Sequence, residues 1–282
     1  MQTNNESTAE KKPKYRLIVE KDDHPVNPRK NKNLGTMVCW LDDCNLGDKK
    51  MYDNPEEYLM QLICDSVSIK RLMEYLQNVF TDNNNRIVYD EVENQWCWQC
   101  KNRGQWSNLY VFTKRDLRKK EFRKKLILEQ LVGKQLLSIA EATNMFIPLF
   151  FYDYGSICIT CTKYTSEHDD GDYFDDIFES GQLGWIYVSY KDIRREYGEI
   201  TPEVTEKVEK RLVNEVNKYN SYLHGDCYKY VIEKCGKIVA NDSGYIGILR
   251  GVISEMKTKA AKEYQHLFDH IRNKRLEYIE EV

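Results

Sequence analysis

Two short apolar runs in the middle of the chain constrain its fold more than any other feature. They cover residues 147–152 and 156–162, and each is too brief and too rich in β-branched or aromatic side chains to form a helix. Asp153, Tyr154 and Gly155 lie between them, and residues of these types favour a tight turn. We therefore predict a β-hairpin here, followed by a further strand at residues 185–188.

An acidic segment, residues 167–179, lies between the hairpin and this further strand. It contains seven carboxylates and no lysine or arginine. Such a segment can be a solvated loop or, because carboxylates are hard ligands, a Ca²⁺ or Mg²⁺ site, although its spacing does not match an EF-hand. The segment also contains the aromatic residues Tyr173, Phe174 and Phe178. Clustered aromatic rings are costly to expose to water, which favours a surface that binds a partner. The residues expected to do so are Asp169, Asp170, Asp172, Tyr173, Phe174, Asp175, Asp176 and Phe178.

A basic block stands in an earlier part of the chain, at residues 114–125, where eight of twelve residues are lysine or arginine. On a helix such a block is most often a solvated surface. It can also bind nucleic-acid phosphates without sequence preference, or the acidic segment of a second copy in a homo-oligomer. The candidate partner-binding residues in it are Lys119, Lys120, Arg123 and Lys124.

The overall charge and hydropathy exclude several classes of protein. The chain has 42 basic and 45 acidic residues and a net charge of -3, which argues against a generally basic nucleic-acid binder. No apolar run approaches the ~20 residues that cross a bilayer, and residues 1–14 lack the apolar core of a signal peptide. We therefore expect a cytoplasmic protein without a membrane partner, whose nine cysteines are mostly reduced.

The cysteines form two Cys-x-x-Cys pairs, Cys97 with Cys100 and Cys158 with Cys161. Four thiolates can hold zinc, so these residues are weak candidates for a metal site. However, the pairs lie far apart in sequence, and the second falls in a predicted strand, where positions i and i+3 face opposite ways. We expect small packed side chains here, and neither a metal nor another cofactor.

No catalytic motif is recognisable in the chain. It has no nucleophile–base arrangement, phosphate-binding glycine loop, dinucleotide fingerprint or kinase motif. We therefore expect a protein that is not an enzyme. Two alternatives remain open: a nucleic-acid-binding module that uses the helix predicted at residues 114–125, and a metal- or nucleotide-binding enzyme with a dispersed site.

The distribution of strand and helix signals predicts an α+β fold, with a mixed or antiparallel sheet covered by helices. We predict strands at residues 86–93 and 109–112 on either side of a Trp/Cys-rich stretch, one long helix over residues 113–143, and a last helix over residues 246–271. The predicted organisation is a disordered tail (1–14), the N-terminal part of the core sheet (15–65), an inserted helical and Trp/Cys-rich lobe (66–144), a central part with sheet, acidic segment and helices (145–244), and a C-terminal helix (245–282).

Several stretches of this chain resemble a family of uncharacterised proteins from bacterial viruses and prophages. They are residues 33–39 (NLGTMVC) with 46–48 (LGD), 147–153 (IPLFFYD), 180–189 (SGQLGWIYVS), 196–198 (EYG) and 222–226 (YLHGD). The resemblance implies a shared scaffold on which residues 66–144 and the acidic segment are additions, and loops added to a scaffold are where specialised function resides. We therefore expect a viral accessory protein that binds and inhibits a host protein complex, of which a nuclease-type antiphage defence system is the favoured class.

Overall fold

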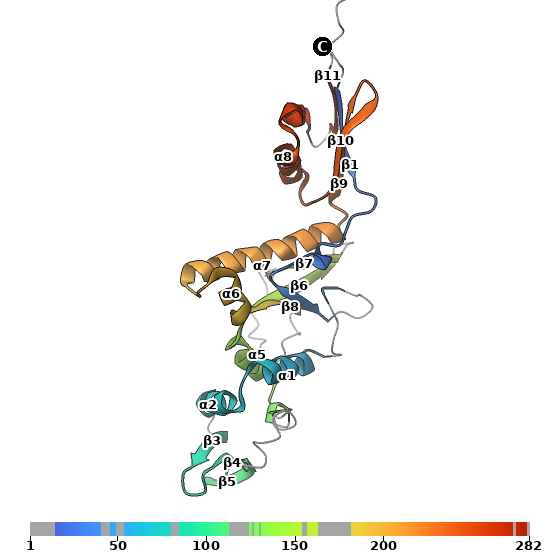
Figure 1. The fold of residues 1–282 in the computed structure, drawn as a ribbon. Helices are drawn as coiled ribbons and strands as arrows, with labels where there is room; N and C mark the ends of the chain where they lie inside the picture. Colours follow the sequence, from blue (N-terminus) through green and yellow to red (C-terminus); the bar gives the residue numbers. More distant parts are fainter. Residues whose placement is uncertain are drawn as a thin grey trace, which may run out of the picture. The chain divides into compact units, whose positions relative to one another are not determined.

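The computed structural model describes residues 15–40, 46–48, 54–79, 85–112, 124–125, 127–129, 131–153, 157–162, 182–272 and 275–280 (Figure 1). The described strands pair antiparallel and are accompanied by helices, so the predicted α+β class is confirmed. Contacts divide the chain into two units. The terminal unit consists of Met1–Asn33, Phe151–Thr160 and Val213–Val282, and the central unit consists of Leu34–Phe150 and Cys161–Leu212.

The terminal unit is built on a four-stranded sheet in the order β10-β9-β1-β11. The strands are β1 (Tyr15–Lys21), β9 (Cys227–Lys234), β10 (Lys237–Ile246) and β11 (Glu277–Glu280). Helix α8 (Leu249–Lys259) and the 3-10 helix η2 (Lys262–His270) supply side chains to the same apolar core as the strands, and α8 is drawn beside the sheet in Figure 1. Leu17 and Val19 alternate with exposed residues along β1 and bury their side chains in this core.

The predicted C-terminal helix is wrong beyond residue 259. Helix α8 ends at Lys259, Ala260 has extended backbone, and the chain continues as η2 before β11 pairs with β1. Strand β10 runs through residues 241–244 to Ile246, with two register shifts against β9. At the C-terminus, pairing of β11 with the distant strand β1 overrides the local helical pattern.

The central unit contains most of a second antiparallel sheet, in the order β2-β8-β6-β7. Its strands are β2 (Thr36–Cys39), β8 (Gln182–Ser189), β6 (Asn144–Asp153) and β7 (Ile157–Thr160). The part of β6 after Phe150 and the whole of β7 belong to the terminal unit. The predicted hairpin and the strand after the acidic segment are thus confirmed. β1 and β2 belong to different sheets, so residues 15–65 do not contribute to one core sheet as predicted.

Helices α1 (Pro55–Ser66), α2 (Ile69–Val79) and α5 (Gly133–Glu141) build the main core of the central unit with Trp185 of β8. Helix α1 begins at Pro55, because the Asn54 side chain accepts a hydrogen bond from the Glu57 N–H (2.7 Å) and Pro55 occupies the first turn. Helix α6 (Tyr190–Tyr197) ends at Gly198, which has a φ of 85°, and α7 (Pro202–Leu223) runs on into the terminal unit. Among the described helices, none is long and apolar enough to cross a membrane.

The lobe predicted as helical contains a three-stranded antiparallel meander after α2. It comprises β3 (Asn85–Asp90), β4 (Gln95–Asn102) and β5 (Gln105–Phe112), so the Trp/Cys-rich stretch is the central strand rather than a connection between two strands. The single helix predicted over residues 113–143 is also wrong. Leu131 and Val132 are not helical, and α5 begins anew at Gly133, where the Val132 N–H donates a hydrogen bond to the Gln135 side-chain oxygen (3.0 Å).

Candidate functional site

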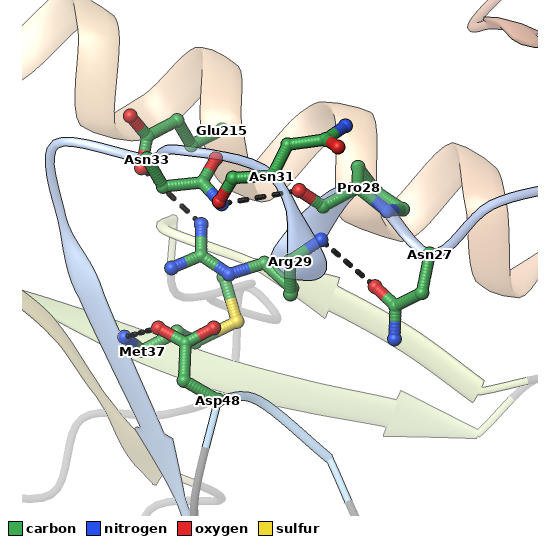
Figure 2. A network of polar contacts seen from close by, with 8 residues as sticks. All are labelled: Asn27, Pro28, Arg29, Asn31, Asn33, Met37, Asp48 and Glu215. Carbon is green, nitrogen blue, oxygen red and sulfur yellow. Dashed lines mark hydrogen bonds and ion pairs between the residues drawn. The ribbon is translucent and has the colours of Figure 1, made fainter.

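The motifs that carry the family resemblance serve the sheet of the central unit. A Cβ on Gly184 would lie 2.1 Å from the carbonyl oxygen of Val38, so only glycine allows β8 to approach β2 this closely. Asp48 accepts a hydrogen bond from the Met37 N–H (2.8 Å; Figure 2), and its own N–H donates to the Met37 carbonyl (2.9 Å). These residues hold β2 in place, so they specify the scaffold rather than a reaction centre.

A buried ion pair anchors a loop of the terminal unit to α7 (Figure 2). Arg29 lies in the 3-10 helix η1 (Pro28–Lys30), which begins where Asn27 accepts a hydrogen bond from the Arg29 N–H (2.8 Å). The Arg29 guanidinium lies 3.2 Å from the Glu215 carboxylate, and the two side chains are only 2% and 12% exposed. A pair so deeply buried is a structural anchor, because each charge requires the other.

The acidic segment lies outside the described residues, with the eight candidates that it carries: Asp169, Asp170, Asp172, Tyr173, Phe174, Asp175, Asp176 and Phe178. Lys119, Lys120 and Arg123 also lie outside them. The structure therefore places only Lys124 among the twelve residues for which partner binding is expected.

Lys124 makes contacts within the chain at the end of α1. Its ammonium group donates hydrogen bonds to the carbonyl oxygens of Cys64 (2.7 Å) and Val67. The last carbonyls of a helix have no partner within the helix, and a cation there also interacts favourably with the helix dipole. In the structure Lys124 thus acts as a cap of α1, which is a structural role and differs from the expected role in partner binding.

We expect Lys124→Met to lower the free energy of unfolding by about 1–3 kcal/mol, because two carbonyls lose a charged donor. Lys125→Met is the matched control. It removes the same charge from an exposed neighbour and should change stability by less than about 0.5 kcal/mol. Urea titration followed by tryptophan fluorescence measures both; equal effects of the two substitutions would contradict the capping role.

The Cys97 and Cys100 thiols do not converge. Cys97 is buried in β4, where burial raises the pKa of its thiol, whereas the Cys100 sulfur lies 3.7 Å from the Ser107 hydroxyl of β5. Cys97 and Cys100 both lie in β4, and residues three apart on a strand face opposite sides of the sheet.

Cys158 lies in β7 and Cys161 follows that strand, and burial raises the pKa of the Cys161 thiol to about 11. Among the residues that the structure describes, no three His, Cys, Asp or Glu side chains form a group that could hold a metal ion. The weak candidate zinc site is therefore not assembled in this structure.

The meander of β3, β4 and β5 has an aromatic face. The rings of Tyr89 and Trp96 lie 5.2 Å apart, and Trp98 pairs across the strands with Tyr110. Trp96 and Trp98 are half-buried against the core of the unit, while the two tyrosines on the outer strands are exposed. The central strand thus fastens the meander to the helices and leaves side chains of the outer strands accessible.

Two aliphatic side chains add to this accessible surface. Val92, in the β3–β4 turn, is 91% exposed, and Leu109 is 59% exposed. Leu109 lies at a register shift of β5: Tyr110 pairs with Trp98 and Asn108 pairs with Gln99, so Leu109 has no residue opposite it on β4. We call the four exposed large apolar side chains of the meander, Tyr89, Val92, Leu109 and Tyr110, the apolar rim. Exposed large apolar side chains are typical of interaction sites.

Sequence reasoning missed the apolar rim for two different reasons. Val92 carried a usable signal, since it is a lone apolar residue between Glu91 and Glu93 in a turn. Leu109 carried none, because a strand pattern does not reveal where a register shift occurs.

The terminal unit contains a groove of about 800 Å³, formed by the end of α7, the end of β10 and the start of α8. Its polar side includes Asn217, Ser221 and His224, and Ile248 on its other side is 80% exposed. The Nδ1 atom of His224 lies 2.8 Å from the Asn220 carbonyl oxygen, which holds the proton on Nδ1 of the neutral ring and leaves Nε2 as an acceptor. The groove can form hydrogen bonds, but no nucleophile among the described residues is hydrogen-bonded to His224.

No family model, curated protein or solved structure matches this chain. The geometry of the described residues is therefore the basis for assigning a site. It favours the apolar rim, because four large apolar side chains are exposed on a meander whose central strand is packed on the core of the unit.

Proposed function

We propose that this protein is a non-enzymatic accessory protein of a bacterial virus that binds a host protein complex and inhibits it, with a nuclease-type antiphage defence system as the class of target. The observation that carries the proposal is the apolar rim of the inserted lobe. The family resemblance adds to it, since an insertion on a shared scaffold is where a specialised partner would be bound.

The rim has the composition of a binding hot spot. Tyrosine and aliphatic side chains lose little entropy when a partner covers them. The two aliphatic side chains, Val92 and Leu109, are 91% and 59% exposed, so a partner that covers them buries apolar surface that is now in water. The strands hold Tyr89, Leu109 and Tyr110 in place before binding, and Val92 lies in the short turn between two of these strands, so little further ordering is needed.

The proposal includes the place of action and the assembly. The protein would act in the cytoplasm of the host cell, where its target operates. We also propose that it forms a homo-oligomer, through the acidic segment of one copy and the basic block of another, because these segments have opposite charge.

The double substitution Val92→Asp/Leu109→Asp tests the function. We expect it to weaken binding of the target complex by about tenfold or more, because two apolar side chains that would be buried become charged. The free energy of unfolding should fall by only about 1 kcal/mol, since neither side chain is part of the core. The measurement is the plating efficiency of a phage on cells that contain a nuclease-type defence system and express the variant.

Ile238→Asp is the matched control, because Ile238 is 61% exposed on β10 of the terminal unit. It should leave inhibition intact. A folded double variant that still inhibits defence as well as the unaltered protein would refute the proposed role of the rim, and an unaltered protein that protects no phage would refute the function.

A further inference from the structure

The second face of the meander carries a chain of hydrogen bonds that fixes one arginine. Strand pairing places Arg86 beside Gln99, and Gln99 beside Asn108. The Arg86 Nε–H donates to Gln99 Oε1 (2.8 Å), and the Gln99 amide donates to Asn108 Oδ1 (2.8 Å). Each strand thus contributes one residue, and the guanidinium is held through a single nitrogen.

An aromatic ring supports the same arginine. The centre of the Arg86 guanidinium lies 4.2 Å from the Trp106 ring, and the Lys101 ammonium lies 5.8 Å from that ring. Attraction between a cation and the face of an indole orients the charge without neutralising it. The terminal nitrogens of Arg86 have no acceptor among the described residues, so the outer edge of the guanidinium remains available to a ligand.

The charges of the meander are separated between its two ends. Arg86, Lys101 and the exposed Arg103 lie toward the β4–β5 turn, and none forms an ion pair with a described acidic residue. The acidic residues Asp90, Glu91 and Glu93 lie at the β3–β4 turn, which is the opposite end of the strands. One end of this face therefore has an uncompensated positive charge.

We infer that this cationic face, made of Arg86, Gln99, Lys101, Arg103, Trp106 and Asn108, binds a short acidic segment of the partner protein. One carboxylate would pair with the outer edge of the Arg86 guanidinium, whose planar geometry suits two parallel hydrogen bonds. Neighbouring carboxylates of the same segment would lie near Lys101 and Arg103. This inference rests on the proposed function, because it takes the partner to be a protein that the inserted lobe binds.

Two observations favour an acidic protein segment over nucleic acid. Base stacking requires an open ring face, and the Trp106 ring is already covered by Arg86 on one side and approached by Lys101. A phosphate backbone is also long and uniformly negative, so it would be repelled where it crossed the acidic end of the meander, whereas a segment of a few carboxylates fits the cationic end alone.

Fluorescence anisotropy of the full chain with a labelled hexaglutamate peptide tests the inference. We expect saturable binding that weakens as salt is added, no binding of the hexaglutamine analogue, and a loss of affinity of about tenfold or more in Arg86→Gln. Lys101→Gln/Arg103→Gln is a second variant at exposed positions and should also weaken binding. Arg194→Gln, with the same charge change on the exposed face of α6, should have no effect beyond about twofold.

Three results would overturn the inference: no binding of hexaglutamate, equal affinity in Arg86→Gln and Arg194→Gln, or tighter binding of a labelled single-stranded oligonucleotide that Arg86→Gln abolishes. The plating assay separates this inference from the proposed function. Peptide binding that depends on Arg86 in a protein that protects no phage would refute the function alone. A variant that no longer binds the peptide but still inhibits defence fully would refute only the inference that the partner is bound through an acidic segment.

Discussion

Gly184→Ala is expected to disrupt the sheet of the central unit and to lower its free energy of unfolding by about 3 kcal/mol. The added Cβ would lie 2.1 Å from the Val38 carbonyl oxygen and 3.1 Å from the Cα of Cys39, and both are backbone atoms of β2 that cannot rotate away. To relieve the overlap, β2 must separate from β8, where four residue pairs join the two strands. Trp185 follows directly in the sequence and is almost fully buried, so the core also loosens.

Tryptophan fluorescence during urea titration is the appropriate measurement for this variant. All five tryptophans, Trp40, Trp96, Trp98, Trp106 and Trp185, lie in the central unit, so the signal reports on that unit. Gly198→Ala is the control. Gly198 also has a positive φ, but nothing lies within 4 Å of an added Cβ, so only backbone strain of about 1 kcal/mol is expected. Equal losses in the two variants would show that the close approach of β2 to Gly184 does not matter.

Arg29→Met is expected to cost about 3–5 kcal/mol in the terminal unit, because it leaves the Glu215 carboxylate buried without its cation. The Glu215→Leu substitution added to it should recover part of the loss, since two apolar side chains then replace the pair. Hydrogen exchange of the β1 and β9 amides is the measurement, because this unit contains no tryptophan.

Lys210→Met is the control for Arg29→Met, because Lys210 lies on α7, the helix that carries Glu215. Lys210 forms an ion pair with Glu206 at 2.5 Å, but both side chains are largely exposed, so its loss should cost less than about 0.5 kcal/mol. A similar small effect of Arg29→Met would mean that the buried pair does not anchor the loop.

Under the proposed function, the apolar rim and the cationic face of the meander would have different roles. The rim would provide affinity, because it offers apolar surface to be buried, whereas the cationic face would select the partner through its fixed charge. Val92, Leu109 and Arg86 can be replaced independently, because none of them is part of the apolar core.

Local signals in the sequence were sufficient for several elements of the fold. The start of α1 was predictable because Asn54, Pro55 and Glu57 act within one helical turn. The end of α6 was predictable because Gly198 adopts a backbone conformation that other residues avoid. The hairpin of β6 and β7 was predictable because its turn and both strands are neighbours in the chain.

Elements that depend on distant partners were not predictable. β11 is a strand because β1, more than two hundred residues away in sequence, offers it an open edge, and no local pattern near Glu277 indicates this. β4 was taken for an irregular stretch because Trp96, Cys97 and Trp98 interrupt any alternation of polar and apolar residues, and its two neighbouring strands make it a strand.

The sequence by itself therefore determined the elements whose causes are local: caps, turns and short apolar runs. The tertiary structure decided the rest, because pairing between distant strands and burial in a shared core exceed local propensities in free energy. The candidate site depends on such effects. Leu109 lies at a register shift of β5, and Arg86 is oriented by Gln99 and Trp106 from two other strands. Outside the site, Lys124 caps a helix about sixty residues earlier in the chain.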